Sequence, residues 1–194
     1  MWSFLHKAIA VNQWRNVAQA ATSDRCPSCT MDVPESLHHA FFECSAAQEA
    51  WVYASTIFFQ HSGVSRPSMP WEPLTWDQCL MGTDLPARLR PRQTTWSLLR
   101  GSVLWLVWLR RNSGVFQNQL WPVEQLERTI REATIDLAKM SWDKYVALLQ
   151  HHPQRAQVSR RTFVATWGTT PLLCNIRDNT IQWNHIRPQR GVFR

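Results

Sequence analysis

The chain has 194 residues, of which 44% are apolar, and it carries a formal net charge of +7. This length suits one or two small domains, and the apolar content is ordinary for a chain that buries a core, which excludes a disordered tail. The longest uninterrupted apolar run, residues 103–109, is far shorter than the roughly 20 residues that span a bilayer, so no membrane partner is expected. An odd number of cysteines and the lack of a signal-peptide pattern at the start favour an intracellular protein, nuclear or cytoplasmic.

Residues 4–21 are predicted to form a first helix. Apolar residues recur there in a broken spacing of three and four, which favours a helix with one buried face. Its aromatic side chains would cover the segment that follows: Trp2, Phe4 and Trp14.

The next segment contains three cysteines and a histidine at ligand spacing, Cys26-x2-Cys29-x9-His39-x4-Cys44. Thiolate and imidazole suit a tetrahedral zinc ion, and three cysteines with one histidine is a usual structural set. Four protein ligands leave no position for a reactive water, so this pattern predicts one structural Zn²⁺ per chain. The rival histidine is His38, because a shift by one residue keeps the same turn. A redox role for Cys26 and Cys29 is disfavoured because the pair lacks a βαβ setting.

The surrounding residues resemble a known family. Glu35-Ser36-Leu37-His38-His39 leads into the last ligand, and residues 4–15, which include Asn12, form an aromatic segment upstream. Downstream, Trp105, Trp108, Arg111-Asn112 and Val115-Phe116 complete the pattern. Together, residues 1–120 resemble the zinc-binding region near the C-terminal end of reverse transcriptases from non-LTR (LINE-type) retrotransposons, especially those of plants. The resemblance implies His39 as the fourth ligand and a role in engaging nucleic acid.

A second helix is predicted over residues 46–59. Ser45 and Gln48 have the form of a capping box, in which both side chains satisfy backbone N–H groups at a helix start. Apolar residues at helical spacing would bury Trp51 beside the metal site.

Residues 61–93 are rich in proline and glycine, so no long helix is expected there. We interpret this stretch as a surface linker, pinned by Trp71 and Trp76, between a zinc-binding module (residues 1–60) and a helical hairpin (residues 94–150).

Two helices are predicted in the hairpin, which should pack antiparallel because the connection is short. The first, residues 94–111, is apolar on nearly every face and should end at Arg110-Arg111-Asn112, with Gly114 in the turn. The second, residues 123–149, has a regular apolar seam, which is more often core than a ligand site: Val123, Leu126, Ile130, Ala133, Leu137 and Met140.

The basic tail, residues 151–194, contains seven arginines and a single acidic residue. The β-branched and aromatic residues of 162–167 and 180–183 favour short strands, with a turn at residues 177–179. The predicted fold class is therefore mainly α: a zinc-stapled helical module, an antiparallel helix pair and a short β-hairpin in a partly disordered tail. Adjacent His151 and His152 would point apart, so they are not expected to bind metal.

Arginines from residue 88 onward predict a nucleic-acid partner, RNA or DNA, because guanidinium groups bind phosphates by charge and by paired hydrogen bonds. The candidate residues are Arg88, Arg90, Arg92, Arg110, Arg111, Arg155, Arg160, Arg161, Arg187 and Arg190. Trp167 or Trp183 would stack on bases. A solubilising surface is the alternative interpretation of the charge.

No catalytic site can be argued from the sequence. Neither Tyr53 nor Tyr145 precedes a pair of aspartates, so the metal-binding Tyr-x-Asp-Asp site of a reverse transcriptase is absent. The expected function is that of a non-catalytic, retrotransposon-derived fragment with structural zinc and nucleic-acid binding. The alternative is a protein-interaction scaffold that meets a partner, or a second copy, through its Trp-rich helices.

Overall fold

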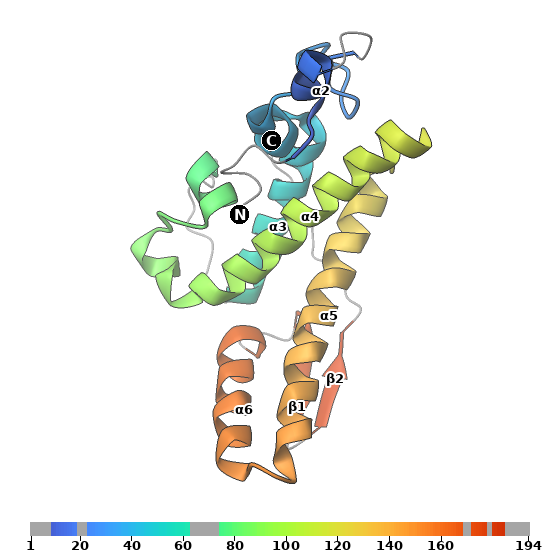
Figure 1. Cartoon of the computed structure of the whole chain (residues 1–194). Coiled ribbons are helices and arrows are strands. Elements are labelled where there is room, and N and C mark those ends of the chain that lie inside the picture. Colours follow the sequence, from blue (N-terminus) through green and yellow to red (C-terminus); the bar gives the residue numbers. More distant parts are fainter. Residues whose placement is uncertain (1–8, 19–22, 63–73, 169–171, 178–179, 185–194) are drawn as a thin grey trace.

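The computed structural model describes residues 9–18, 23–62, 74–168, 172–177 and 180–184, which are mainly helical with one small antiparallel sheet (Figure 1). The predicted fold class is therefore confirmed. The predicted first helix is seen as α2 (Asn12–Ala18), and the rest of its predicted span lies largely outside the described residues. Trp14 packs against the main core, which includes Cys26 and Cys44, whereas Trp2 and Phe4 lie outside the described residues.

Helices α4 (Gln93–Gln117) and α5 (Val123–Leu149) form the predicted antiparallel pair at the centre of the molecule (Figure 1). Helix α5 has the predicted bounds, although Met140 of its expected seam is exposed. Helix α4 continues about two turns beyond its predicted end, and Gly114 lies inside it. The helix stops at Asn118, which adopts a left-handed conformation (φ 53°), and Gln119 N–H then donates to the Ser113 carbonyl (3.1 Å).

Helix α3 (Ser45–Ser62) crosses α4 and buries Trp51 beside Trp96. The predicted capping box does not form. Ser45 is already helical, and the Gln48 amide instead donates to the Phe42 carbonyl, which ties α3 to the turn before it.

The second half of the predicted linker is packed against the body of the protein. It contains a five-residue π-helix, η2 (Asp77–Met81), and a 3₁₀ turn, η3 (Ala87–Arg92). Its buried residues belong to the main core: Cys79, Leu80, Leu85 and Leu89. No long helix forms in the described part, as expected, but these residues are not a surface crossing. Residues 63–73, with Trp71, lie outside the described residues.

The described part of the tail is ordered. Helix α6 (Pro153–Trp167) runs back along the second half of α5, and β1 (Cys174–Arg177) pairs with β2 (Thr180–Trp183) in register Cys174 to Trp183 (Figure 1). The predicted strand at 180–183 is confirmed. The predicted strand at 162–167 is wrong, because Phe163 and Trp167 lie four residues apart on one helical face that is buried against α5. The predicted turn falls partly on residues 178–179, outside the described residues.

Among the described residues there are two apolar cores, and α5 takes part in both. The first joins the cysteine-containing segment (residues 23–44), α3, η2, η3, α4 and the first half of α5. The second joins the second half of α5, α6 and the hairpin. The packing therefore runs across residues 61–93, and the change from one core to the other occurs along α5.

Candidate metal centre

The structure brings the four predicted ligands together. One ligand atom from each of Cys26, Cys29, His39 and Cys44 lies within 4.8 Å of the other three. The Cys26 and Cys44 sulfurs are 3.9 Å apart, and the Cys29 sulfur is 3.4 Å from His39 Nε2. Ligand atoms around a tetrahedral zinc ion with ordinary bond lengths are about 3.5 to 3.8 Å apart. The cluster is therefore close to the geometry that a bound metal ion requires.

A tight loop presents the first two cysteines. Its base is closed by a bridge between Arg25 and Pro34, and Cys26 N–H donates to the Val33 carbonyl (2.9 Å). Within the loop, Ser28 N–H points at the Cys26 sulfur (3.4 Å). Asp32 adopts a left-handed conformation (φ 49°), which turns the chain back toward its base. This loop brings both sulfurs to one side.

A π-turn presents the other two ligands. His39 begins η1 (His39–Glu43), and Cys44 N–H donates to the His39 carbonyl across five residues (2.7 Å). In an α-helix, five residues advance about 500°, so the two side chains would point about 140° apart. The wider π-turn reduces this angle and places the imidazole and the thiol on one side. The five-residue spacing between His39 and Cys44 is therefore suited to a π-turn rather than to an α-helix.

Of the two adjacent histidines, His39 belongs to the cluster. It is 4% exposed, and its Nε2 faces Cys29 while its Nδ1 lies 3.9 Å from a Glu43 carboxylate oxygen. A carboxylate behind the second ring nitrogen is a usual way to orient a ligating histidine. His38 instead pairs with Glu43 (3.1 Å) and lies against the Trp76 ring, 4.4 Å between centroids.

The surroundings of Cys44 favour its thiolate, whereas those of Cys26 favour its protonated thiol. A hydrogen bond from the Cys26 thiol lowers the pKa of Cys44 to about 5, and N–H groups of Ala46 and Ala47 at the start of α3 act in the same direction. The pKa of Cys26 is raised, first because it holds the shared proton and then because it is buried. Metal binding requires thiolates, so an ion at this position would replace that shared proton.

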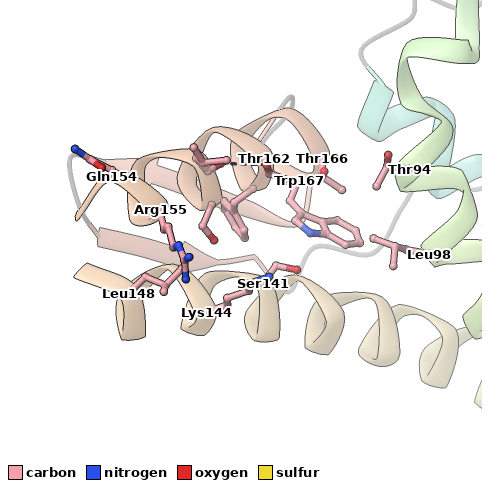
Figure 2. A pocket seen from close by; sticks show the side chains of 13 residues that line it. Thr94, Leu98, Ser141, Lys144, Leu148, Gln154, Arg155, Thr162, Thr166 and Trp167 are labelled. Carbon is pink, nitrogen blue, oxygen red and sulfur yellow. Dashed lines mark hydrogen bonds between the residues drawn. The ribbon is translucent and has the colours of Figure 1, made fainter. Parts of the chain in front are cut away.

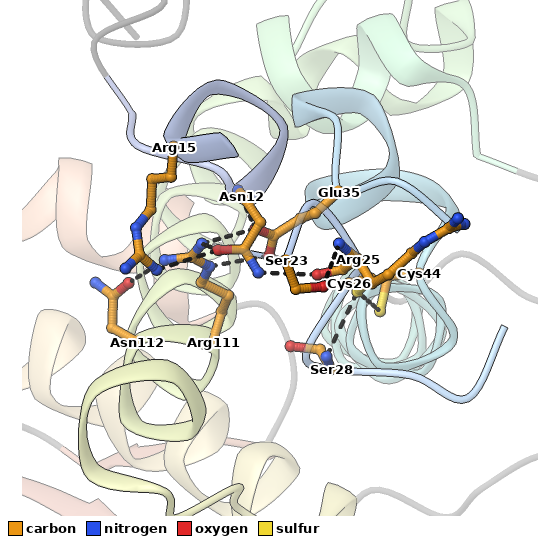
Figure 3. Close-up of polar contacts among 10 residues, drawn as sticks. All are labelled: Asn12, Arg15, Ser23, Arg25, Cys26, Ser28, Glu35, Cys44, Arg111 and Asn112. Carbon is orange, nitrogen blue, oxygen red and sulfur yellow. Dashed lines mark hydrogen bonds and ion pairs between the residues drawn. The ribbon is translucent and has the colours of Figure 1, made fainter. Parts of the chain in front are cut away.

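A buried arginine of α4, Arg111, holds the segment that carries the cysteines. Arg111 donates to both carboxylate oxygens of Glu35 (2.9 and 2.7 Å) and to the Asn12 side-chain oxygen (2.8 Å), and Asn12 N–H donates to Glu35 (2.6 Å) (Figure 3). Glu35 is completely buried and Arg111 is 3% exposed. The Asn12 amide also donates to the Arg25 carbonyl (2.8 Å), directly before the first ligand. We call Asn12, Glu35 and Arg111 the buried network; it fixes the loop to α4.

Arg110 lies on the other side of the same helix turn, close enough to Cys26 and Cys44 for their charges to interact with it. Burial lowers its pKa, and the two cysteines oppose that shift. Its Nε donates to the Trp121 carbonyl (2.8 Å). Three thiolates and a divalent ion would leave one net negative charge, which this guanidinium offsets.

The expectation that Arg110 and Arg111 bind phosphate is therefore corrected, since both are buried and held inside the protein. The sequence suggested a basic helix end because no acidic residue occurs between Asp84 and Glu124. Arg111 is paired with Glu35, which lies 76 positions earlier in the sequence. Glu35 lies between the two pairs of predicted ligands, and no lysine or arginine occurs in residues 26–44, so its partner had to come from elsewhere in the chain.

The remaining candidate arginines differ in exposure. Arg88 and Arg90 on η3 and Arg155 and Arg161 on α6 are exposed, whereas Arg92 and Arg160 are half-buried. Arg92 donates to the Ala165 carbonyl (2.8 Å), which joins η3 to the end of α6. Arg187 and Arg190 lie outside the described residues.

The two tryptophans that were expected to stack on bases differ in their exposure to solvent. Trp167 is 1% exposed and part of the second core, so it is not available for stacking. Trp183 is half-buried and meets the edge of Phe163.

In the described part of the chain, no helix is long and apolar enough to cross a membrane. Comparison with known proteins adds no identification: no family model matches the chain, and no curated protein or solved structure matches it significantly.

Proposed function

We propose that Cys26, Cys29, His39 and Cys44 bind one structural zinc ion. The observation that carries this proposal is the convergence of three thiols and one imidazole, drawn from two segments, within 4.8 Å. Zinc is favoured because thiolate and imidazole are the ligands it prefers, and because its structural sites are tetrahedral and closed. The four side chains fill that coordination, so the ion would hold the loop to the π-turn and carry out no catalysis.

The protein is proposed to be a non-catalytic fragment derived from the C-terminal region of a non-LTR retrotransposon reverse transcriptase. Support comes from the buried network. Asn12, Glu35 and Arg111 belong to the three separate segments that carry the resemblance, and they contact one another although Asn12 and Arg111 are 99 positions apart. Residues that look like isolated family features in the sequence thus form one structural unit.

Its proposed partner is nucleic acid, RNA or DNA, bound through exposed arginines. We call Arg88, Arg90, Arg155 and Arg161 the arginine surface. Because Arg92 attaches η3 to the end of α6, the two elements that carry these residues are adjacent. Exposed guanidinium groups bind phosphate by charge and by paired hydrogen bonds, which gives affinity with little sequence preference.

A salt titration tests this partner. Binding of single-stranded RNA and duplex DNA is measured by fluorescence anisotropy over a range of salt concentrations, for the wild type and for the variant Arg88→Gln with Arg90→Gln. Each phosphate contact contributes about 0.7 to the salt slope on a single strand and about 0.9 on a duplex. The slope should therefore become shallower by about 1.4 on RNA or about 1.8 on DNA.

The matched control is Arg128→Gln with Lys139→Gln, which removes two positive charges that lie on α5 and on neither η3 nor α6. Its slope should change much less. Wild-type protein that shows no salt-dependent binding to either nucleic acid would reject the nucleic-acid partner.

In that case the second candidate function, a protein-interaction scaffold, would take precedence. It is favoured by large apolar side chains that the fold leaves in solvent, Trp105 (60% exposed) and Phe116 (65% exposed), both on α4. Association through such residues should depend little on salt.

A further inference from the structure

The second core leaves an open groove between α5, α6 and the start of α4, with a volume of about 660 Å³ (Figure 2). Leu148 on α5 and Val158 on α6 line its sides, Phe163 and Trp167 lie deeper, and Leu98 closes the end near α4. This volume lies within the range of small-molecule sites. The groove shares no residue with the metal centre.

Its hydroxyl groups are largely engaged elsewhere. Ser141 donates to the Leu137 carbonyl (2.9 Å), and Thr162 donates to the Val158 carbonyl (3.0 Å), each within its own helix. The Thr166 carbonyl accepts from Thr95 (3.0 Å). Five apolar side chains form the wall of the groove, and Thr94, Gln154 and Ser159 add further polar groups to its lining.

Two cations form the exception. Lys144 on α5 and Arg155 on α6 both line the groove, and Figure 2 shows them near its end away from Leu98. Both are exposed, and no carboxylate among the described residues pairs with either. No acidic side chain is found among the described residues that line the groove. A cavity with apolar walls and an unneutralised positive end is complementary to an anion with an apolar body.

We propose that this groove binds an amphiphilic anion, that is, an aliphatic or aromatic body with one carboxylate or phosphate head. The body lies along Leu98, Leu148 and Val158, over Phe163 and Trp167. The head lies between Lys144 and Arg155, where charge-assisted hydrogen bonds are formed without loss of an existing ion pair.

The test is isothermal titration calorimetry of the full chain with dodecanoate below its critical micelle concentration. Dodecyl phosphate is the second anionic ligand and distinguishes a phosphate from a carboxylate head. Dodecyltrimethylammonium has the same tail and the opposite charge, and acetate has the head without the tail. Dodecanoate, dodecyl phosphate or both should bind saturably with one ligand per chain, and the last two compounds should bind much more weakly.

Two pairs of variants locate the site. Lys144→Gln with Arg155→Gln should weaken binding of the anion by about tenfold, as expected for two exposed charge contacts. Lys139→Gln with Arg161→Gln removes the same charge from the same helices outside the groove and should leave affinity within about twofold. Val158→Glu should lower the affinity for the anion because its carboxylate repels the anionic head. Val164→Glu, which is also on the exposed part of α6, should leave the affinity unchanged.

Three results would overturn the proposal: no saturable binding of either anion, equal binding of the cationic amphiphile, or equal loss in the groove and control variants. Arg155 belongs to both this proposal and the arginine surface, but the two tests are distinguishable because the nucleic-acid variants change Arg88 and Arg90, which do not line the groove.

Discussion

His39 is held by contacts on both sides of its ring, with Cys29 at Nε2 and Glu43 near Nδ1. His38 lies on the outer side, against Trp76. We therefore predict that His39→Ala loses stoichiometric zinc, whereas His38→Ala keeps it. The metal content of the two purified variants, measured by inductively coupled plasma mass spectrometry, gives the answer. Zinc retained by His39→Ala and lost by His38→Ala would reverse the assignment.

The ion pair of Glu35 and Arg111 is almost fully buried, and its hydrogen bonds are satisfied by Asn12 as well as by each other. Removal of one partner leaves a buried charge without compensation, so Arg111→Ala should lower the free energy of unfolding by about 3 to 5 kcal/mol. Urea denaturation measures this change. The exposed Arg88→Ala should change stability by less than about 0.5 kcal/mol.

A double variant distinguishes the cost of an unpaired buried charge from the loss of the ion pair itself. Glu35→Gln with Arg111→Met removes both charges and should be less destabilising than Arg111→Ala alone. Equal destabilisation of Arg88→Ala and Arg111→Ala would show that the buried network does not secure the loop.

The cluster of Cys26, Cys29, His39 and Cys44 could be predicted from the sequence because metal chemistry would impose residue type and spacing directly. The roles of Arg110 and Arg111 could not, because an arginine binds phosphate, an acid or a carbonyl with the same group. Burial decides among these, and burial depends on the whole fold.

At the scale of elements, two glycines should respond in opposite ways to substitution by alanine. Gly101 lies within α4, and a Cβ there would meet nothing within 4 Å, so Gly101→Ala should stabilise the protein by about 0.5 to 1 kcal/mol. Gly82 ends η2 with φ 70°, and a Cβ there would lie 2.8 Å from Arg100 Nε. Gly82→Ala should destabilise by about 1 to 2 kcal/mol from the backbone alone.

Thermal unfolding of both variants compares the two effects. A stabilising Gly82→Ala would mean that the chain does not turn through a left-handed residue after η2.

Regular helices were the most predictable elements. The bounds of α5 follow from its apolar seam and from Trp121-Pro122 at its start. Helix α6 was missed because Thr162, Val164 and Thr166 favour strands locally, whereas the burial of Phe163 and Trp167 against α5 outweighs that preference. Local propensity determines the secondary structure of a segment only where tertiary packing is weak.

At the scale of the whole molecule, the metal centre belongs to the first core and the groove to the second. Proline content suggested a boundary at residues 61–93, yet Leu80, Leu85 and Leu89 enter the first core from that stretch. Proline excludes long helices but does not prevent burial, so composition alone does not show which parts of such a stretch are packed.

Removal of metal should therefore act unequally on the two cores. With a strong chelator, hydrogen exchange should increase in residues 23–44 and at the start of α3, since the ligands tie these segments together. Exchange in α6 should change little. Uniform loss of protection over both cores would show that they unfold as one unit.

The central claim is a structural zinc ion held by four side chains. Native mass spectrometry of the full chain, purified without added metal, tests it most directly. The account predicts one zinc ion per chain, lost on acidification together with the folded charge-state distribution, because protons compete for the thiolates and the imidazole. A folded, metal-free chain that gains no mass and no stability when zinc is added would contradict it.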